Sequence, residues 1–275
     1  MSRSTRIFLA GLIAVCAITF ESRAADGPPL TPELRETPKG TPFAVIEAAK
    51  RPAPTLLVCA KDALSTLTED PYGHTGALLH AEGWNVIALD LPCHGADVRE
   101  GERPQLDGWR DRVERGENIV TPWQARVNDV LAHLVDAGIA QPDRFVAEGT
   151  SRGGYMACQA AAANPAIRAV AAYAPVTDLL ALREFEGLES NALARELALI
   201  NTADALAARP LWLTIGSQDT RVGTDKAIEF ARSLTAAADK AQQPAQVTLH
   251  ILPTPGHSST NEDHERAAAW ILGLK

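Results

Sequence analysis

The order of apolar and amphipathic segments predicts an α/β fold, with a mostly parallel sheet covered by helices on both faces. Short apolar runs at 55–59, 84–89, 169–174 and 211–215 are typical of strands that are buried on both sides. Helix-like stretches of ten residues or more separate such runs, for example at 122–137. Strands that alternate with helices of this length indicate parallel strands joined by crossover helices.

The remaining elements are predicted from the same periodicities and from turn residues. Further strands are expected at 43–48, 145–147 and 247–252, and further helices at 72–82, 151–163, 225–238 and 261–272.

Three segments do not fit the simple alternation. Residues 25–42 are rich in proline and charge and are expected to form an N-terminal arm. Residues 93–121 read as a loop crowded with arginine, and residues 176–209 read as a helical insertion between two strands. Because long insertions in compact domains often have a function, we expect the last two to shape a binding site.

Composition places the chain among ordinary globular proteins. Its 275 residues are 46% hydrophobic and 22% charged, which suffices for one domain with a sizeable core. The formal net charge is -8, so the chain has no bulk electrostatic attraction for nucleic acid or for anionic membranes. We therefore expect neither as a partner.

The N-terminus has the pattern of a secretory signal. Basic residues precede an apolar run at 7–20, and small residues offer a cleavage site after Ala24. The run is too short for a permanent span, so residues 1–24 are predicted to direct export, to the periplasm or the cell exterior, and 25–275 to form the mature domain. A lipid on Cys16 is a weaker alternative.

Three cysteines remain beyond this signal. Cys59, Cys93 and Cys158 show no metal-binding spacing, so we expect no metal site and treat them as small buried hydrophobic residues. A bond between Cys59 and Cys93 stays open as an alternative in an oxidising compartment.

The strongest chemical signal is the segment 149–154, which reads Gly-Thr-Ser-Arg-Gly-Gly. It matches G-x-S-x-G and lies between a predicted strand and a predicted helix, which is the context that a nucleophilic serine requires in this motif. The helix N-terminus and the next backbone N–H can stabilise a negative oxygen there. Ser151 is therefore the predicted nucleophile, although a turn rich in Gly and Ser that only starts a helix is the plainer alternative.

A serine nucleophile needs a base, and the base needs a carboxylate that orients it. Asp219 follows the strand predicted at 211–215, and His257 follows the strand predicted at 247–252. Both lie on loops at the same edge of the sheet as Ser151, where ligands bind in open α/β sheets. The predicted triad is Ser151, Asp219 and His257.

Other acids and histidines compete for these roles. Asp178 also follows a strand, but it is expected to cap the helix after it. His250 lies within a predicted strand and His264 within the last helix, while His94 is expected to shape a turn. None of these histidines lies on a loop at the required edge.

These residues carry a resemblance to a known group of proteins. The segments 149–154, 90–95, 219–222 and 256–257 are similar to those of the α/β-hydrolase superfamily, and more narrowly of its dienelactone hydrolase and prolyl oligopeptidase-type branch. The resemblance covers about residues 43–273. It implies an eight-stranded, mostly parallel sheet with a lid-like helical excursion after the sixth strand, which corresponds to 176–209. It also implies that no cofactor is needed.

The resemblance further implies an oxyanion hole beside the serine. The family often has His-Gly after its third strand, but here the matching stretch reads Cys59-Ala60-Lys61-Asp62. We predict that the backbone N–H of Lys61 or Ala60 pairs there with the N–H of Arg152. The Lys61 side chain is expected to be solvated, with contact to an anionic substrate as the alternative.

Glu148 precedes the serine motif at a position where an apolar residue is usual. A partly buried carboxylate needs a partner, and Arg152 or Arg221 could supply one. We expect this carboxylate to have a structural role.

The predicted activity is hydrolysis of carboxylic esters through an acyl-enzyme. No propeller segment accompanies the domain, which favours a small-molecule or glycan-linked ester, and the arginines of 93–121 hint at acidic or sugar-linked esters. The alternative is a serine exopeptidase or amidase of the prolyl oligopeptidase-like type. A non-catalytic binding protein on the same fold is the third reading.

Overall fold

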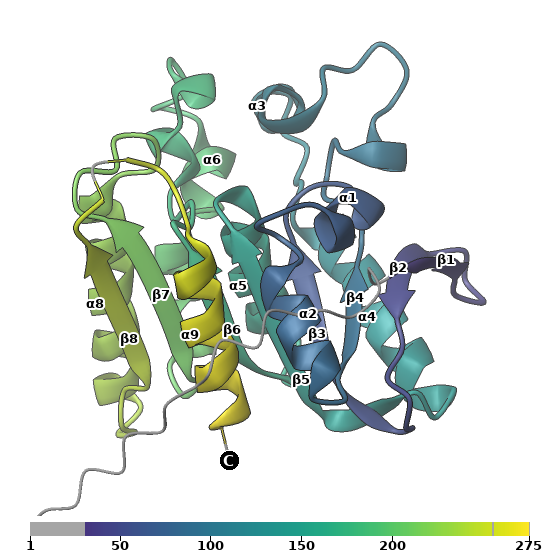
Figure 1. The fold of residues 1–275 in the computed structure, drawn as a ribbon. Coiled ribbons are helices and arrows are strands. Elements are labelled where there is room, and N and C mark those ends of the chain that lie inside the picture. The colour runs from purple at the N-terminus through teal and green to yellow at the C-terminus, as the bar shows by residue number, and fades with distance from the viewer. Residues whose placement is uncertain (1–30, 255, 275) are drawn as a thin grey trace, which may run out of the picture.

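An eight-stranded sheet forms the centre of the molecule in a computed structural model that describes residues 31–254 and 256–274 (Figure 1). Its strand order is β1-β2-β4-β3-β5-β6-β7-β8. Strand β2 pairs antiparallel with β1 and β4, and the remaining neighbours are parallel, as predicted. The bounds are β1 Glu33–Glu36, β2 Pro42–Ile46, β3 Ala53–Cys59, β4 Asn85–Ala88, β5 Ala140–Thr150, β6 Ile167–Tyr173, β7 Leu211–Gly216 and β8 Val247–Leu252.

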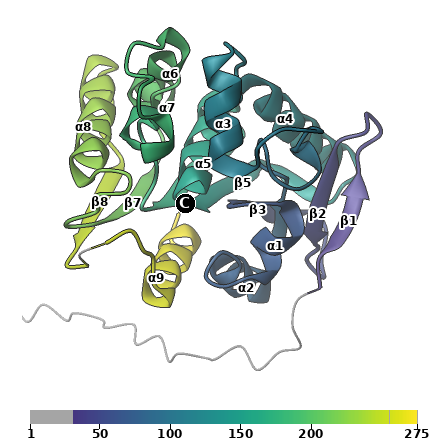
Figure 2. The same cartoon turned by 90° about the horizontal axis from the view of Figure 1, so that it is seen from above.

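Helices cover both faces of this sheet (Figure 2). Helices α1, α2 and α9 lie on one face, and α4, α5 and α8 lie on the other. The bounds are α1 Ala63–Thr68, α2 His74–Ala81, α3 Gln105–Glu114, α4 Thr121–Asp136, α5 Arg152–Ala163, α8 Thr224–Lys240 and α9 Asn261–Leu272.

The core consists of two apolar clusters, one on each face of the sheet. Strand β3 serves both: Leu57 belongs to the larger cluster, while Leu56 and Val58 belong to the smaller one beneath α1, α2 and α9. Successive strand residues point to opposite faces, so a strand with helices on both sides is apolar at most positions. This explains the unbroken apolar runs that mark the strands in the sequence.

Strand β1 and the helices α1 and α3 were missed by the sequence prediction. Strand β1 lies within the expected arm 25–42, and its sequence Glu-Leu-Arg-Glu is mostly exposed. Helix α3 lies within 93–121, which was wrongly predicted to be a loop. It buries Leu106, Trp109 and Val113 at helical spacing, although charged residues surround them in the sequence.

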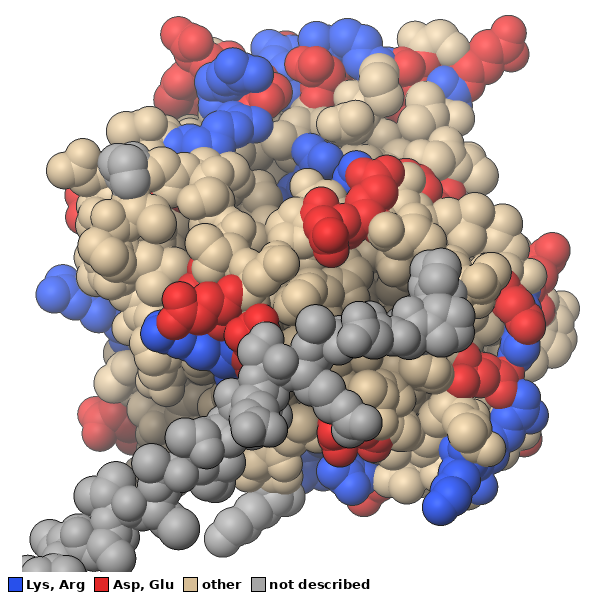
Figure 3. Space-filling model, viewed as in Figure 1, with Lys and Arg blue, Asp and Glu red and all other residues tan. Residues whose placement is uncertain are grey.

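The arginines of 93–121 are paired with carboxylates, so they no longer indicate an acidic or sugar-linked substrate. Arg112 is 5% exposed and donates to Asp97 and Glu102 at 2.5–2.8 Å. The other pairs are Arg99–Glu117, Arg103–Asp111, Arg110–Glu114 and Arg115–Glu117. Figure 3 likewise shows acidic and basic side chains interspersed on the visible face.

The insertion 176–209 packs into the larger core cluster. It contains short helical turns and the helices α6 (Ala192–Glu196) and α7 (Ala203–Leu206). Leu179, Phe185, Leu199 and Leu206 are fully buried. Part of the insertion, including α6, rises above the end of the sheet where the serine motif lies (Figure 1).

The predictions for the N-terminal segment cannot be compared with the described residues. The predicted export signal and the alternative lipid site at Cys16 lie outside the described residues. Among the residues that the structure describes, no helix has the length and apolar character needed to cross a bilayer.

Cys59, Cys93 and Cys158 are buried and free, so the alternative bond between Cys59 and Cys93 does not form.

Candidate active site

Ser151 occupies a sharp turn between β5 and α5. Its backbone has φ 58° and ψ -119°, a conformation that is strained for a residue with a side chain. A Cβ on Gly149 would lie 2.3 Å from the Gly153 carbonyl carbon, and a Cβ on Gly153 would lie 1.8 Å from the Cys59 oxygen. Only glycine therefore fits at either flank, because the turn presses the chain against itself. The motif lifts the Ser151 side chain out of the sheet.

Asp219 and His257 meet at the neighbouring strand ends. Asp219 follows β7, and its Oδ2 lies 2.8 Å from His257 Nδ1. Its Oδ1 accepts from the backbone N–H groups of Arg221 at 2.8 Å and Val222 at 3.1 Å. The Asp219 side chain is fully buried and that of His257 is 25% exposed. Asp219 is thus held rigidly, and it in turn orients the imidazole.

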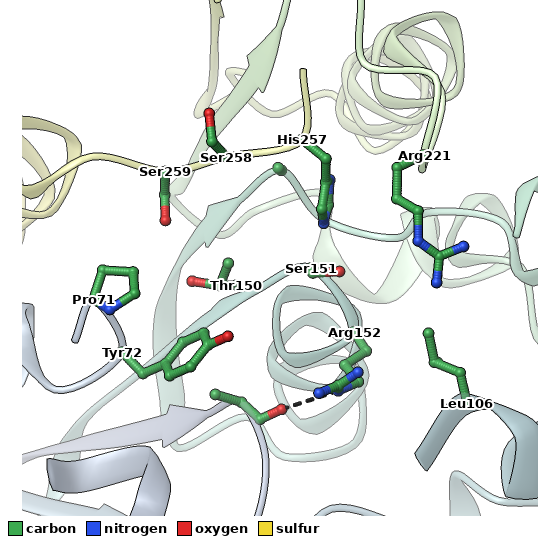
Figure 4. A pocket seen from close by; sticks show the side chains of 12 residues that line it. Pro71, Tyr72, Leu106, Thr150, Ser151, Arg152, Arg221, His257, Ser258 and Ser259 are labelled. Carbon is green, nitrogen blue, oxygen red and sulfur yellow. Dashed lines mark hydrogen bonds between the residues drawn. The ribbon is translucent and has the colours of Figure 1, made fainter. Parts of the chain in front are cut away.

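Ser151 and His257 face one cavity of ≈ 380 Å³. In Figure 4 the His257 ring points toward Ser151, which lies beneath it. The cavity is also lined by Ala60, Pro71, Tyr72, Leu106, Thr150, Arg152, Ala174, Arg221, Ser258 and Ser259. The structure therefore brings the three predicted triad residues to one place, with the serine accessible from the cavity.

The competing residues have other partners. Asp178 caps a helical turn, because its Oδ1 accepts from the backbone N–H of Leu180 at 3.0 Å. His250 lies within β8, and the ring of His94 contacts the Pro92 carbonyl at 2.8 Å. His264 lies on α9 in a separate buried cluster.

The predicted use of the Lys61 backbone N–H in an oxyanion hole is wrong. That N–H donates to Thr66 Oγ1 at 2.9 Å, so it is not free for a substrate oxygen. The Lys61 ammonium pairs with Glu69 and lies 5.2 Å from the centre of the Tyr72 ring. Ala60, the other candidate, lines the cavity.

Arg152 has the position that an oxyanion donor requires. It is the first residue of α5, and an N–H in the first turn of a helix has no acceptor within the helix. Its side chain also lines the cavity. Arg152 and Ala60 thus both border the cavity beside Ser151.

Arg152 and Arg221 were suggested as partners of Glu148, but the structure pairs neither of them with this carboxyl group. Glu148 is 1% exposed, and its Oε2 accepts from the Tyr173 hydroxyl at 3.0 Å, while its Oε1 has no partner among the described residues. Burial raises the pKa of Glu148 to about 8. The carboxyl is therefore largely protonated at neutral pH.

Two cavity residues had no predicted role there. Tyr72 lies a few residues after the stretch 59–62 in which an oxyanion donor was expected, and in Figure 4 its hydroxyl points into the cavity, toward Ser151. Arg221 stands two residues after Asp219 and donates to both oxygens of Glu184 at 2.7 Å. The sequence shows that Arg221 stands near Asp219. It could not show that Arg221 pairs with Glu184 of the insertion 176–209. No cluster of three or more residues suited to hold a metal ion occurs within 31–254 and 256–274.

Comparison with known proteins identifies a family and a fold. The sequence pattern of the prolyl oligopeptidase family matches residues 124–272, which is more than half of the chain. No protein among the curated sequences compared matches this chain.

Several solved structures have the same fold. Dipeptidyl peptidase 4 of Porphyromonas gingivalis matches 89% of this chain with a TM-score of 0.65 and 16% identity. A puromycin-hydrolyzing peptidase of Mycobacterium tuberculosis matches 86% with a TM-score of 0.62 and 18% identity. The acylaminoacyl peptidase of Pyrococcus horikoshii matches 88% with a TM-score of 0.64 and 15% identity. The matched regions are 35%, 38% and 40% of these three proteins, so this chain spans well under half of their lengths.

Proposed function

Because this chain belongs to the prolyl oligopeptidase family and is a serine hydrolase, we propose that it cleaves short peptides or related amides. Ser151 is the nucleophile, His257 the general base and acid, and Asp219 the residue that orients His257. The observation that carries the proposal is the shared cavity, in which a strained, accessible serine faces a histidine held by a buried carboxylate.

In the first step, Ser151 Oγ attacks the carbonyl carbon of the scissile bond. His257 takes the serine proton on Nε2, because its Nδ1 is bonded to Asp219. The resulting oxyanion accepts hydrogen bonds from the N–H groups of Arg152 and Ala60. These donors are part of the rigid backbone, so they need no reorganisation when the charge develops. His257 then protonates the leaving amine, and the acyl group remains on Ser151.

In the second step, water replaces the amine. His257 removes a proton from the water as it attacks the acyl carbonyl, and the same oxyanion hole stabilises the second tetrahedral intermediate. Collapse of that intermediate releases the carboxylic acid and returns the proton to Ser151. The reaction draws on residues that lie at one edge of the sheet.

Esters remain the second candidate substrates. The same serine, histidine and oxyanion hole can cleave an ester, whose alcohol leaves more readily than an amine. The sequence alone favoured an ester, whereas the family match and the peptidases with the same fold favour the peptidase alternative.

The first experiment is labelling with a fluorophosphonate probe. The wild type should be labelled, and Ser151→Ala should not. The matched control is Ser258→Ala, which removes another hydroxyl from the same cavity and should still be labelled. If the folded wild type is not labelled, the result would favour a non-catalytic binding protein on the same fold.

The second experiment separates the two substrate classes. Substrates with the same N-acyl dipeptide are compared as p-nitroanilide, an amide, and as p-nitrophenyl ester. Cleavage of the anilide that is lost in Ser151→Ala supports the peptidase proposal. Cleavage of the ester alone, across several dipeptides, would favour an esterase.

A further inference from the structure

The side chain of Arg152 lies in the cavity, and no carboxylate of the described residues pairs with it. Its Nε donates to the Ala60 carbonyl oxygen at 3.3 Å, which Figure 4 draws as a dashed line. Within residues 31–254 and 256–274 it forms no salt bridge. Arg221, on the same cavity, is different because Glu184 binds its guanidinium through two bonds of 2.7 Å. One cavity thus holds a paired arginine and an unpaired one.

The cavity lining is positive, although the whole chain is acidic. None of the 12 lining residues is Asp or Glu, whereas Arg152 and Arg221 both line it. Glu184 is the carboxylate whose charge acts on Arg152, and it is bonded to Arg221. His94 adds no charge, because burial and the charge of Arg152 lower its pKa to about 4.

The unpaired charge of Arg152 is costly in this position. Burial lowers the pKa of Arg152, because its charged form is partly removed from water. A partly buried guanidinium without a counter-ion loses hydration that a single carbonyl bond does not fully replace. Most of its N–H groups remain available, and their planar arrangement matches the two oxygens of a carboxylate.

The position of Arg152 connects this charge to the reaction. It directly follows Ser151 in the chain, so an anion that binds its side chain lies close to the bond that is cleaved. In Figure 4 the guanidinium lies between Tyr72 and Leu106. Leu106 offers an apolar wall to an aliphatic segment between the reacting carbonyl and the anion.

We propose that Arg152 binds a carboxylate of the substrate and makes the enzyme selective for acidic substrates. This inference rests on the proposed function, because it concerns the substrate of the same site. The carboxylate is either an acidic side chain of the acyl residue or a free terminal carboxylate. The lining offers no Asp or Glu for a free substrate ammonium, which argues against recognition of a free amino terminus.

The test compares substrates that differ only in charge. The p-nitrophenyl esters of N-acetyl-glutamate and N-acetyl-glutamine have nearly the same shape, and such activated esters report on either a peptidase or an esterase. We expect the wild type to favour the glutamate ester in kcat/KM by about tenfold to a hundredfold, the effect of a charge-assisted hydrogen-bond pair. The result is the ratio of the kcat/KM values for the two substrates, so a general loss of activity does not affect it.

Variants then assign the preference to Arg152. In Arg152→Gln the ratio should fall to about one, and Arg152→Lys should keep part of it, because lysine retains the charge but not the planar fork. Arg232→Gln is the matched control. Arg232 lies exposed on α8, so its loss changes the net charge equally but should leave the ratio as in the wild type.

A second pair of substrates identifies the source of the carboxylate. N-acetyl-dialanine with a free terminal carboxylate is compared with its terminal amide, and the products are measured by mass spectrometry. A preference for the acid that depends on Arg152 supports the terminal source, whereas a preference in the glutamate pair alone supports the side chain. Equal rates within both pairs would overturn the inference, as would a preference that survives in Arg152→Gln. Fluorophosphonate labelling of Ser151 separates such an outcome from failure of the proposed function.

Discussion

Two clusters in the molecule each join a histidine to a carboxyl group, and their environments make them different. In the first, Asp219 bonds His257 directly at 2.8 Å, and the histidine borders the cavity. In the second, Glu148 and His264 are connected through two buried hydroxyls. The clusters contain the same types of titratable group, so residue type alone does not determine what they do.

Burial and partners account for the difference. Thr75 Oγ1 lies 2.8 Å from the Tyr173 hydroxyl and 2.9 Å from His264 Nδ1, and Tyr173 donates to Glu148. Burial raises the pKa of Glu148 to about 8 and lowers that of His264 to about 4, so both are mostly neutral at pH 7. Asp219 instead receives two backbone N–H groups in addition to the bond with His257. A carboxylate with such donors can stabilise an imidazolium that forms during a reaction, and a buried neutral network cannot.

The substitution Asp219→Asn is expected to have the largest effect, a loss of catalytic activity. This change keeps the shape of the side chain but removes the charge and favours the wrong tautomer of His257. We expect kcat/KM to fall on the order of 10³- to 10⁴-fold in a hydrolysis assay. The matched change in the buried cluster, Glu148→Gln, should cost far less activity. Equal losses in the two variants would contradict the proposed difference between the clusters.

The next effect concerns the pH dependence of stability. Because the pKa of Glu148 is raised on folding, its contribution to stability is complete below about pH 4.5 and is lost as the pH rises through about 8. Relative to Glu148→Gln, the wild type should therefore lose about 3–5 kcal/mol of unfolding free energy across this window. Urea unfolding at pH 5 and pH 8 measures it. A difference between the two proteins that does not change with pH would show that Glu148 is ionised in the fold.

A smaller effect is expected at the junction of the buried cluster. Thr75→Val keeps the shape of the side chain but removes the hydroxyl that bonds Tyr173 and His264. Leaving these buried groups without that partner should lower the unfolding free energy by about 1–3 kcal/mol. The rate of fluorophosphonate labelling serves as the control, since the triad does not involve Thr75. A marked fall in that rate would mean that the clusters act together.

The smallest effect is expected at Ser259, which borders both the cavity and the buried cluster. Ser259 lines the cavity, and its Oγ lies 3.3 Å from His264 Nε2, which is long for a hydrogen bond. Ser259→Ala should change the unfolding free energy by about 0.5–1 kcal/mol, as measured by urea unfolding. A loss comparable to that of Thr75→Val would show that the cluster extends to the cavity wall.

The accuracy of the sequence prediction followed the strength of local patterns. Apolar runs located the buried strands, because strands covered on both faces are apolar at most positions. Strand β1 and helix α3 were missed because charged residues dominate their sequences, although α3 buries three apolar residues. The backbone N–H of Lys61, one of the two donors predicted for the oxyanion hole, is already bonded within the protein. The sequence could not show that the Thr66 hydroxyl oxygen accepts a hydrogen bond from the Lys61 N–H.

The sequence by itself determined the class of fold, the serine motif and the order Ser151, Asp219, His257. It did so because periodicity, glycine at tight turns and the ends of parallel strands are local properties of the chain. The tertiary structure alone decided that Glu148 bonds Tyr173, that Glu184 binds Arg221 and that Arg152 has no carboxylate partner within residues 31–254 and 256–274. These outcomes depend on groups far apart in the chain that compete for the same partners, and on how much water the fold leaves around each of them.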